Sequence, residues 1–289
     1  MARMDVAESP IPRIEWRTIT VEKRQTRYGV GGTGTPVLFL HGWGMTHRAY
    51  LRPLSHLTRN RLRVFAPALP GFGGTADLPV EHRSLTGYAR WVWRFCEAAQ
   101  VPTPITVVGH SFGGGVAIQS AHDFASLASR LILVNSIGGS KWADGRGVIR
   151  ASSERPLWDW GLHLQADLTM RREATRVLPV ITREAVPNVL RNPRAVWRVA
   201  HLARTADLEE ELAELRARRL PIVIVWSTRD TVIPESTLLS LRTSLGDPAL
   251  VTVPGGHTWL IGDPARFGEV ITNIVSAPQE AEDESRRND

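Results

Sequence analysis

The stretch Gly109-His110-Ser111-Phe112-Gly113 follows an apolar run, Ile105-Thr106-Val107-Val108, and leads into the small residues Gly113-Gly114-Gly115-Val116-Ala117. This order predicts a strand, a sharp turn and a helix. It is the pattern of a nucleophile elbow, in which a strained turn holds a serine hydroxyl above a sheet while glycines let strand and helix pack closely. The turn also places Ser111 at a helix N-terminus, whose free N–H groups favour the negative charge that develops in acyl transfer. The alternative is a plain turn in which the serine only caps the helix.

Composition limits the class of protein. At 289 residues with 43% apolar residues, the chain fits one large α/β domain with an insertion, or two small domains. Its apolar runs fall far short of the roughly 18 residues that a membrane helix requires, and the N-terminus carries no apolar signal region. We therefore expect a cytoplasmic protein without a membrane span. The single cysteine, Cys96, excludes an intrachain disulfide and a cysteine-based metal cluster, and the net charge of +6 favours an anionic partner.

Short apolar runs alternate with helical patterns along the chain. The first two runs alternate apolar and polar residues, as edge strands do, and the later ones are typical of strands buried on both faces. This alternation predicts a doubly wound, mainly parallel eight-stranded sheet of the α/β class. The expected strands are 14–20, 24–30, 36–40, 63–67, 105–108, 130–135, 221–226 and 249–253.

The long segment between the sixth and seventh expected strands is too long for a plain crossover, so we expect an inserted helical cap. The predicted organisation is a core of residues 13–138, a cap of residues 139–217, the rest of the core at 218–276 and a disordered tail at 277–289. Residues 141–204 carry 12 Lys and Arg against 6 Asp and Glu. These arginines can simply solvate the outer faces of helices, or they can form a basic lid for an anionic substrate or an acidic carrier protein.

A glycine-rich turn, His41-Gly42-Trp43-Gly44, follows the expected strand 36–40. Such a turn can aim a backbone N–H into a site and, with the N–H after the nucleophile, form an oxyanion hole. The predicted donors are the amides of Trp43 and Phe112, and the same two residues are expected to contact the substrate. His41 is expected to support the loop rather than to transfer protons.

Ser111, Asp230 and His257 all follow carboxyl ends of expected parallel strands, where open α/β sheets place their sites. Serine is a poor nucleophile at neutral pH, so it needs an imidazole to accept its proton and a carboxylate to fix and stabilise that imidazole. We therefore predict these residues to be a catalytic triad. Asp247 and Asp263 fit less well as the acid, because they lie in a turn and at a helix start.

These motifs resemble those of α/β-hydrolase-fold serine hydrolases of the carboxylesterase and lipase kind, over nearly all of residues 14–275. The resemblance rests on His41-Gly42-Trp43-Gly44, on Gly109-His110-Ser111-Phe112-Gly113, on Asp230 within Arg229-Asp230-Thr231-Val232-Ile233-Pro234, and on Gly256-His257. It implies hydrolysis of a carboxylic ester or thioester of a small or acyl-chain substrate through an acyl-enzyme, with no metal or organic cofactor. Some members carry the acid after the preceding strand, where this chain has Asn135. Relatives also often have an aspartate at the position of Ala68. This difference is expected to affect only the local geometry of the loop.

The substrate stays open at this point. The motifs also resemble methyl-ester carboxylesterases that act on carrier-bound acyl chains, and the same residues serve carbon–carbon bond hydrolases and cofactor-free perhydrolases. A ligand-binding receptor with slow turnover is an alternative from another class. Nucleic-acid binding is disfavoured, because the basic residues are scattered among acidic ones. We expect a small-molecule ester partner, anionic or carrier-bound, while specificity and oligomeric state depend on side-chain directions that the sequence does not give.

Overall fold

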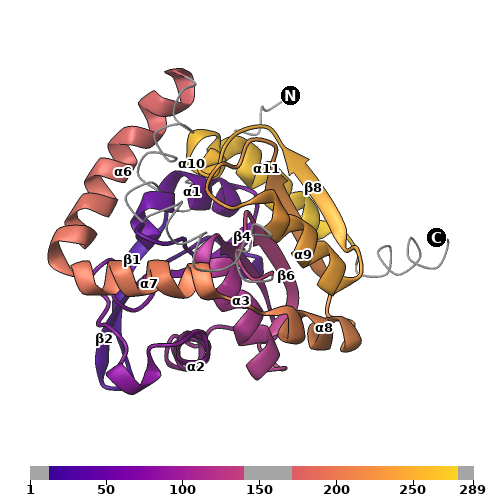
Figure 1. Cartoon of the computed structure of the whole chain (residues 1–289). Coiled ribbons are helices and arrows are strands. Elements are labelled where there is room, and N and C mark those ends of the chain that lie inside the picture. Colours follow the sequence, from indigo (N-terminus) through magenta and orange to yellow (C-terminus); the bar gives the residue numbers. More distant parts are fainter. Residues whose placement is uncertain (1–12, 140–170, 279–289) are drawn as a thin grey trace, which may run out of the picture.

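An eight-stranded sheet with the order β1-β2-β4-β3-β5-β6-β7-β8 runs through the computed structural model (Figure 1). The structure describes residues 13–139 and 171–278. β2 pairs antiparallel with β1 and with β4, and all other neighbouring strands are parallel. The strands are β1 (Glu15–Val21), β2 (Arg24–Gly31), β3 (Thr35–Leu40), β4 (Leu62–Pro67), β5 (Ile105–His110), β6 (Ala128–Val134), β7 (Ile222–Ser227) and β8 (Ala249–Val253). The predicted doubly wound, mainly parallel sheet is confirmed.

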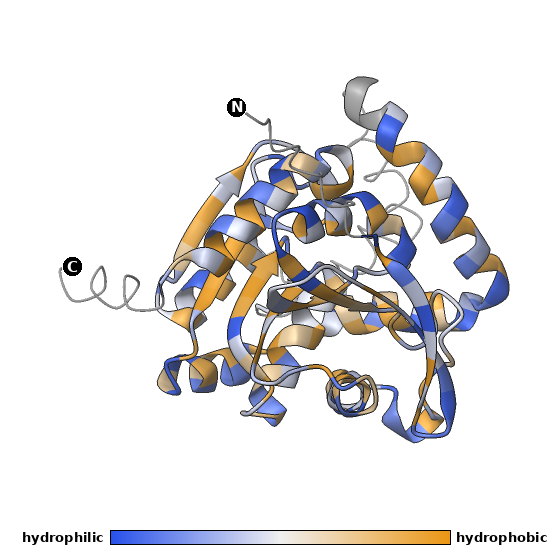
Figure 2. Ribbon diagram, turned by 180° about the vertical axis from the view of Figure 1, so that it is seen from behind, coloured by the Kyte–Doolittle hydropathy of each residue, from blue (hydrophilic) through white to orange (hydrophobic). Residues whose placement is uncertain are grey.

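Helices cover both faces of this sheet, and each face has its own apolar core. The alternation of side chains along β3 shows the division, because Leu38 and Leu40 pack in one core and Val37 and Phe39 in the other. Figure 2 shows hydrophobic residues dominating the central strands. The helices of the core are α1 (Leu51–Arg59), α2 (Leu85–Ala98), α3 (Phe112–Asp123), α9 (Glu235–Leu245), α10 (Trp259–Gly262) and α11 (Pro264–Ser276).

Local sequence signals fix where these helices begin and end. Ser84 caps α2 by accepting a hydrogen bond of 3.1 Å from the Gly87 N–H, and the Asp263 side chain caps α11 ahead of Pro264. α9 ends at Leu245 and is capped by Gly246, whose left-handed φ of 71° few other residues adopt at low cost. These caps therefore define where each helix begins or ends, and with it where the loops that join helices and strands lie.

The segment between β6 and β7 contributes α6 (Arg171–Arg191), α7 (Pro193–Thr205) and α8 (Glu209–Ala217). α6 lies at the outer edge of the molecule and α7 continues from it (Figure 1). α8 falls within the range predicted for the cap, yet it packs against α3 and α9. Residues 140–170 of the predicted cap and residues 279–289 of the predicted tail lie outside the described residues, so the domain boundaries stay a prediction.

In the described parts of the chain, no helix combines the length and the apolar character that crossing a membrane demands.

Candidate active site

Ser111 occupies the sharp turn between β5 and α3. Its φ of 55° and ψ of −121° are rare for a residue with a side chain, and such strain persists only where the surroundings enforce it. A Cβ on Gly109 would lie 2.5 Å from the Gly113 oxygen, and a Cβ on Gly113 would lie 2.3 Å from the Leu40 oxygen, so this approach of strand and helix requires both glycines. The serine side chain makes no capping hydrogen bond to α3. The turn therefore has the predicted geometry of a nucleophile elbow and not that of a simple helix cap.

Asp230 and His257 meet beyond the carboxyl ends of β7 and β8. The distance from His257 Nδ1 to Asp230 Oδ2 is 2.8 Å, and both side chains are almost completely buried. The second carboxylate oxygen, Oδ1, accepts hydrogen bonds from the backbone N–H groups of Val232 (2.8 Å) and Ile233 (2.9 Å). The carboxylate is thus held in place from both sides, and the proton on His257 is directed to Nδ1.

Asn135, at the end of β6, is a partner of Asp230 that the sequence analysis missed. Its Nδ2 donates to Asp230 Oδ2 at 2.6 Å and to Ser227 Oγ at 2.7 Å, and its Oδ1 accepts from Trp259 Nε1 at 2.9 Å. Because the indole can only donate, the orientation of the amide is fixed. The sequence signal that could have revealed this contact is the position of Asn135 directly after β6. Because β6 and β7 are neighbouring parallel strands, the residues that follow them lie close together.

Burial alone would raise the pKa of Asp230. The proximity of His257 and the hydrogen bonds from His257, the Ile233 amide and Asn135 outweigh burial and lower that pKa below its ordinary value. Asp230 is therefore a carboxylate at neutral pH, and it can stabilise a positive charge on His257.

A chain of buried hydrogen bonds joins the glycine-rich turn to the loop of His257. The Gly42 N–H donates to the Tyr50 hydroxyl (3.2 Å), this hydroxyl donates to His110 Nδ1 (2.9 Å), and His110 Nε2 donates to the His257 carbonyl oxygen (3.1 Å). Burial, with the nearby His257, lowers the pKa of His110 to about 3, so its ring is neutral and can both accept and donate. His110 and Tyr50 thus fix three loops relative to one another, a function that the sequence did not reveal for Tyr50.

The glycine-rich turn lies directly against the elbow, because a Cβ on Gly42 would be 3.1 Å from Ser111 Cβ. His41 supports this turn as expected. Its Nδ1 donates to the Gly42 carbonyl (2.9 Å), its Nε2 accepts from the Leu69 N–H (2.9 Å), and burial lowers its pKa to about 4. The turn and the elbow are therefore adjacent, as an oxyanion hole requires.

The two residues predicted to supply oxyanion donors use their side chains elsewhere. Trp43 Nε1 donates to the Val196 carbonyl of α7 at 2.7 Å. The Phe112 ring is 1% exposed and packs edge-on against Tyr88, with ring centroids 5.2 Å apart. Phe112 is also the first residue of α3, where a backbone N–H has no partner within the helix. Only the backbone of Phe112 is thus suited to bind a ligand.

Other candidate groups are engaged away from this site or are inert. The Asp247 carboxylate accepts a hydrogen bond of 2.6 Å from Arg242, and Asp263 caps α11. Cys96 is buried, and burial raises the pKa of its thiol to about 12. Within residues 13–139 and 171–278, no group of three or more His, Cys, Asp or Glu side chains is arranged to hold a metal ion.

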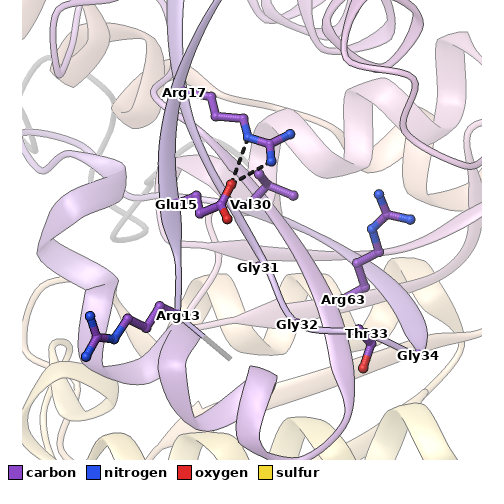
Figure 3. A pocket seen from close by; sticks show the side chains of 9 residues that line it. All are labelled: Arg13, Glu15, Arg17, Val30, Gly31, Gly32, Thr33, Gly34 and Arg63. Carbon is purple, nitrogen blue, oxygen red and sulfur yellow. Dashed lines mark hydrogen bonds and ion pairs between the residues drawn. The ribbon is translucent and has the colours of Figure 1, made fainter. Parts of the chain in front are cut away.

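A hollow of about 530 Å³ lies beside the turn Gly31–Gly34, near the amino-terminal ends of β3 and β4. Figure 3 shows Arg13, Arg17 and Arg63 around it, pointing in different directions, with Arg17 paired to Glu15. Ser111 lies beyond the carboxyl ends of the parallel strands. The hollow is therefore not part of the candidate active site.

The chain is similar to known proteins over most of its length. A model of the family described as "Alpha/beta hydrolase family" matches residues 37–270. The chain is 25% identical to the pimeloyl-[acyl-carrier protein] methyl ester esterase of Aromatoleum aromaticum, over 83% of this chain and 97% of that protein. It is 26% identical to the 2-hydroxy-6-oxo-2,4-heptadienoate hydrolase of Pseudomonas putida, over 85% and 91%. The esterase structure from Exiguobacterium antarcticum shares the fold, with a TM-score of 0.72 and 18% identity, and covers 91% of this chain and all of that one.

Proposed function

Because this chain belongs to the alpha/beta hydrolase family, we propose that it is a serine hydrolase that cleaves a carboxylic ester or thioester through Ser111, His257 and Asp230. The observation that carries the proposal is the combination of a strained elbow serine with a buried His257–Asp230 contact of 2.8 Å at the same edge of the sheet. Neither an elbow nor a buried ion pair alone would specify hydrolysis, but acyl transfer by serine needs all of these groups.

In the proposed reaction, Ser111 Oγ attacks the acyl carbon while His257 Nε2 accepts the hydroxyl proton. Nε2 acts as the acceptor because the contact with Asp230 keeps the N–H proton of the neutral ring on Nδ1. The bond to the leaving alcohol or thiol then breaks, and His257 returns the proton to the leaving atom. Water next attacks the acyl-enzyme, gives its proton to His257, and releases the acid as the proton passes back to Ser111.

The negative oxygen of each tetrahedral intermediate would bind to the backbone N–H groups of Trp43 and Phe112. The contact of the glycine-rich turn with the elbow supports this assignment, as does the position of Phe112 at the start of α3. Removal of one such donor typically costs about 10² to 10³ in turnover.

The proposed substrate is an acyl ester with an anionic or carrier-bound portion. α6 and α7, residues 171–205, contain 8 Arg and 2 Glu. The name of the Aromatoleum aromaticum relative, a methyl ester esterase for an acyl-carrier-bound substrate, supports the same substrate class. The second candidate is hydrolysis of a carbon–carbon bond, which the Pseudomonas putida relative favours.

The test is hydrolysis of p-nitrophenyl esters with acyl chains from C2 to C12. Wild type is compared with Ser111→Ala and, as a matched control, with Ser55→Ala, whose hydroxyl donates to the Leu51 carbonyl of its own helix. We expect turnover in the wild type and in the control but not in Ser111→Ala, with the preferred chain length giving the size of the acyl site.

A folded wild type without ester turnover would refute the esterase proposal. Cleavage of a vinylogous diketone would then identify the carbon–carbon hydrolase, and its absence would leave a ligand-binding receptor.

A further inference from the structure

α6 and α7, in the segment between β6 and β7, hold the oxyanion loop, defined here as residues 41–46, by hydrogen bonds. Trp43 Nε1 donates to the Val196 carbonyl of α7 at 2.7 Å. Thr46 Oγ1 donates to Glu184 of α6 at 2.7 Å. The loop is therefore tied at both of these residues to the segment inserted between β6 and β7.

Between these two ties, the side chain of Asn188 from α6 reaches the loop. Its Nδ2 donates to the Gly44 carbonyl at 3.1 Å, and its Oδ1 accepts from the Gly73 N–H at 3.2 Å. Asn188 is only 5% exposed, and the amide uses both of its ends to join two loops of the core. A buried amide with both ends occupied is costly to disturb.

Gly44 lies in the middle of the oxyanion loop and is itself buried. Gly44 has a left-handed φ of 72°, and a Cβ placed on it would meet no atom within 4 Å. The Gly44 carbonyl accepts the buried hydrogen bond from Asn188, so this bond helps to set the direction of the peptide that follows Gly44.

We propose that Asn188 is a positioning residue for the oxyanion hole, so that α6 sets the geometry of the loop that carries the Trp43 amide. This inference rests on the proposed function. Asn188 does not touch the reacting atoms. It acts by holding the loop at the distance of about 2.7–3.1 Å at which an N–H stabilises the oxyanion. Because displacement of a catalytic group by about 1 Å can cost about 10²-fold, loss of this support lowers kcat by about 10- to 100-fold.

A purely structural role for Asn188 would be to fasten α6 to the core. Two variants separate the roles. Asn188→Ala removes both hydrogen bonds, whereas Asn188→Asp keeps an acceptor for the Gly73 N–H and loses the donor to the Gly44 carbonyl. Asn192→Ala is the matched control, because Asn192 lies in the same segment and caps α7 by accepting from the Ala195 N–H at 3.2 Å.

The experiment measures kcat and KM for the preferred p-nitrophenyl ester, together with inhibition by a trifluoromethyl ketone of the same acyl chain. The ketone forms a tetrahedral adduct with the serine and therefore reports on the oxyanion hole. We expect both Asn188 variants to lose about 10- to 100-fold in kcat and, by the same factor, in affinity for the ketone, with KM within about twofold. Asn192→Ala should stay within about threefold of wild type in each quantity.

An Asn188→Asp variant that matches wild type in kcat and ketone affinity would overturn the inference. So would a rise in KM at unchanged kcat, since that result assigns α6 to substrate enclosure. Thermal unfolding of every variant identifies a loss of activity that comes from unfolding alone. Absence of serine-dependent turnover in the wild type would overturn the proposed function as well, whereas normal wild-type turnover with a silent Asn188→Asp variant overturns this inference only.

Discussion

Replacing Asn135 by aspartate should make the stability of the protein fall steeply as pH rises. The change is nearly isosteric, and it places a second carboxylate where Nδ2 now lies 2.6 Å from Asp230 Oδ2. Two ionised carboxylates at this distance repel each other by about 6 kcal/mol at an effective dielectric constant near 20. The pair is therefore expected to share one proton, as closely spaced carboxylates do.

The size of the effect follows from that shared proton. An aspartate in the unfolded chain has a pKa of about 3.9, so holding a proton on the folded pair costs about 1.4 kcal/mol for each pH unit above this value. The cost is about 1.5 kcal/mol at pH 5 and about 5.5 kcal/mol at pH 8, which remains below the repulsion energy. Because the pKa of the pair is raised, stability is greatest at low pH and is lost with rising pH.

The assay is urea unfolding of wild type, Asn135→Asp and Asn135→Ala between pH 5 and pH 8. Relative to wild type, Asn135→Asp should lose about 4 kcal/mol of unfolding free energy over this range, whereas the neutral alanine variant should show a constant offset. Adding Asp230→Asn to Asn135→Asp leaves one carboxylate at the site and should abolish the extra pH dependence. A curve for Asn135→Asp that runs parallel to wild type would refute the contact between residues 135 and 230.

Tyr50→Phe leaves the Gly42 N–H and His110 Nδ1 without their hydrogen-bond partner. We therefore expect urea unfolding to show a loss of about 1–3 kcal/mol in unfolding free energy, and ester hydrolysis to show a lower kcat. Gly114→Ala would place its Cβ 1.9 Å from Ser136 Oγ. We expect this overpacking to cost about 1–3 kcal/mol of unfolding free energy and so to lower the melting temperature. An unchanged melting temperature would contradict the close approach at the elbow. The pKa of Asp230 is lower in the folded protein than in the unfolded chain, where it is about 3.9, so ionised Asp230 stabilises the fold above that pH and this stability is lost as pH falls through the folded pKa. Asp230→Asn should therefore flatten the acid side of the stability–pH curve. A curve as steep as that of wild type would argue against this linkage.

Much of the fold was predictable because its signals are local. The apolar runs that become β3, β5 and β7 are buried on both faces. The ends of each of these strands lie within two residues of the predicted ends. The elbow was equally clear, since an apolar run precedes the glycines around Ser111 and small, helix-compatible residues follow them. Asp230 was preferred to Asp247 and Asp263 because it follows the carboxyl end of an expected strand, and the structure places its carboxylate 2.8 Å from His257 Nδ1.

The sequence by itself thus determined the sheet, the elbow and the order of the polar residues that follow the strands, because strand periodicity and turn chemistry act between neighbours in the chain. Only the tertiary structure decided which distant side chains complete the site. Asn135 meets Asp230 across 95 residues of chain, Tyr50 meets His110 across 60, and Asn188 meets Gly44 across 144. Such hydrogen bonds depend on the relative placement of whole strands and helices. No local pattern of residues encodes that placement.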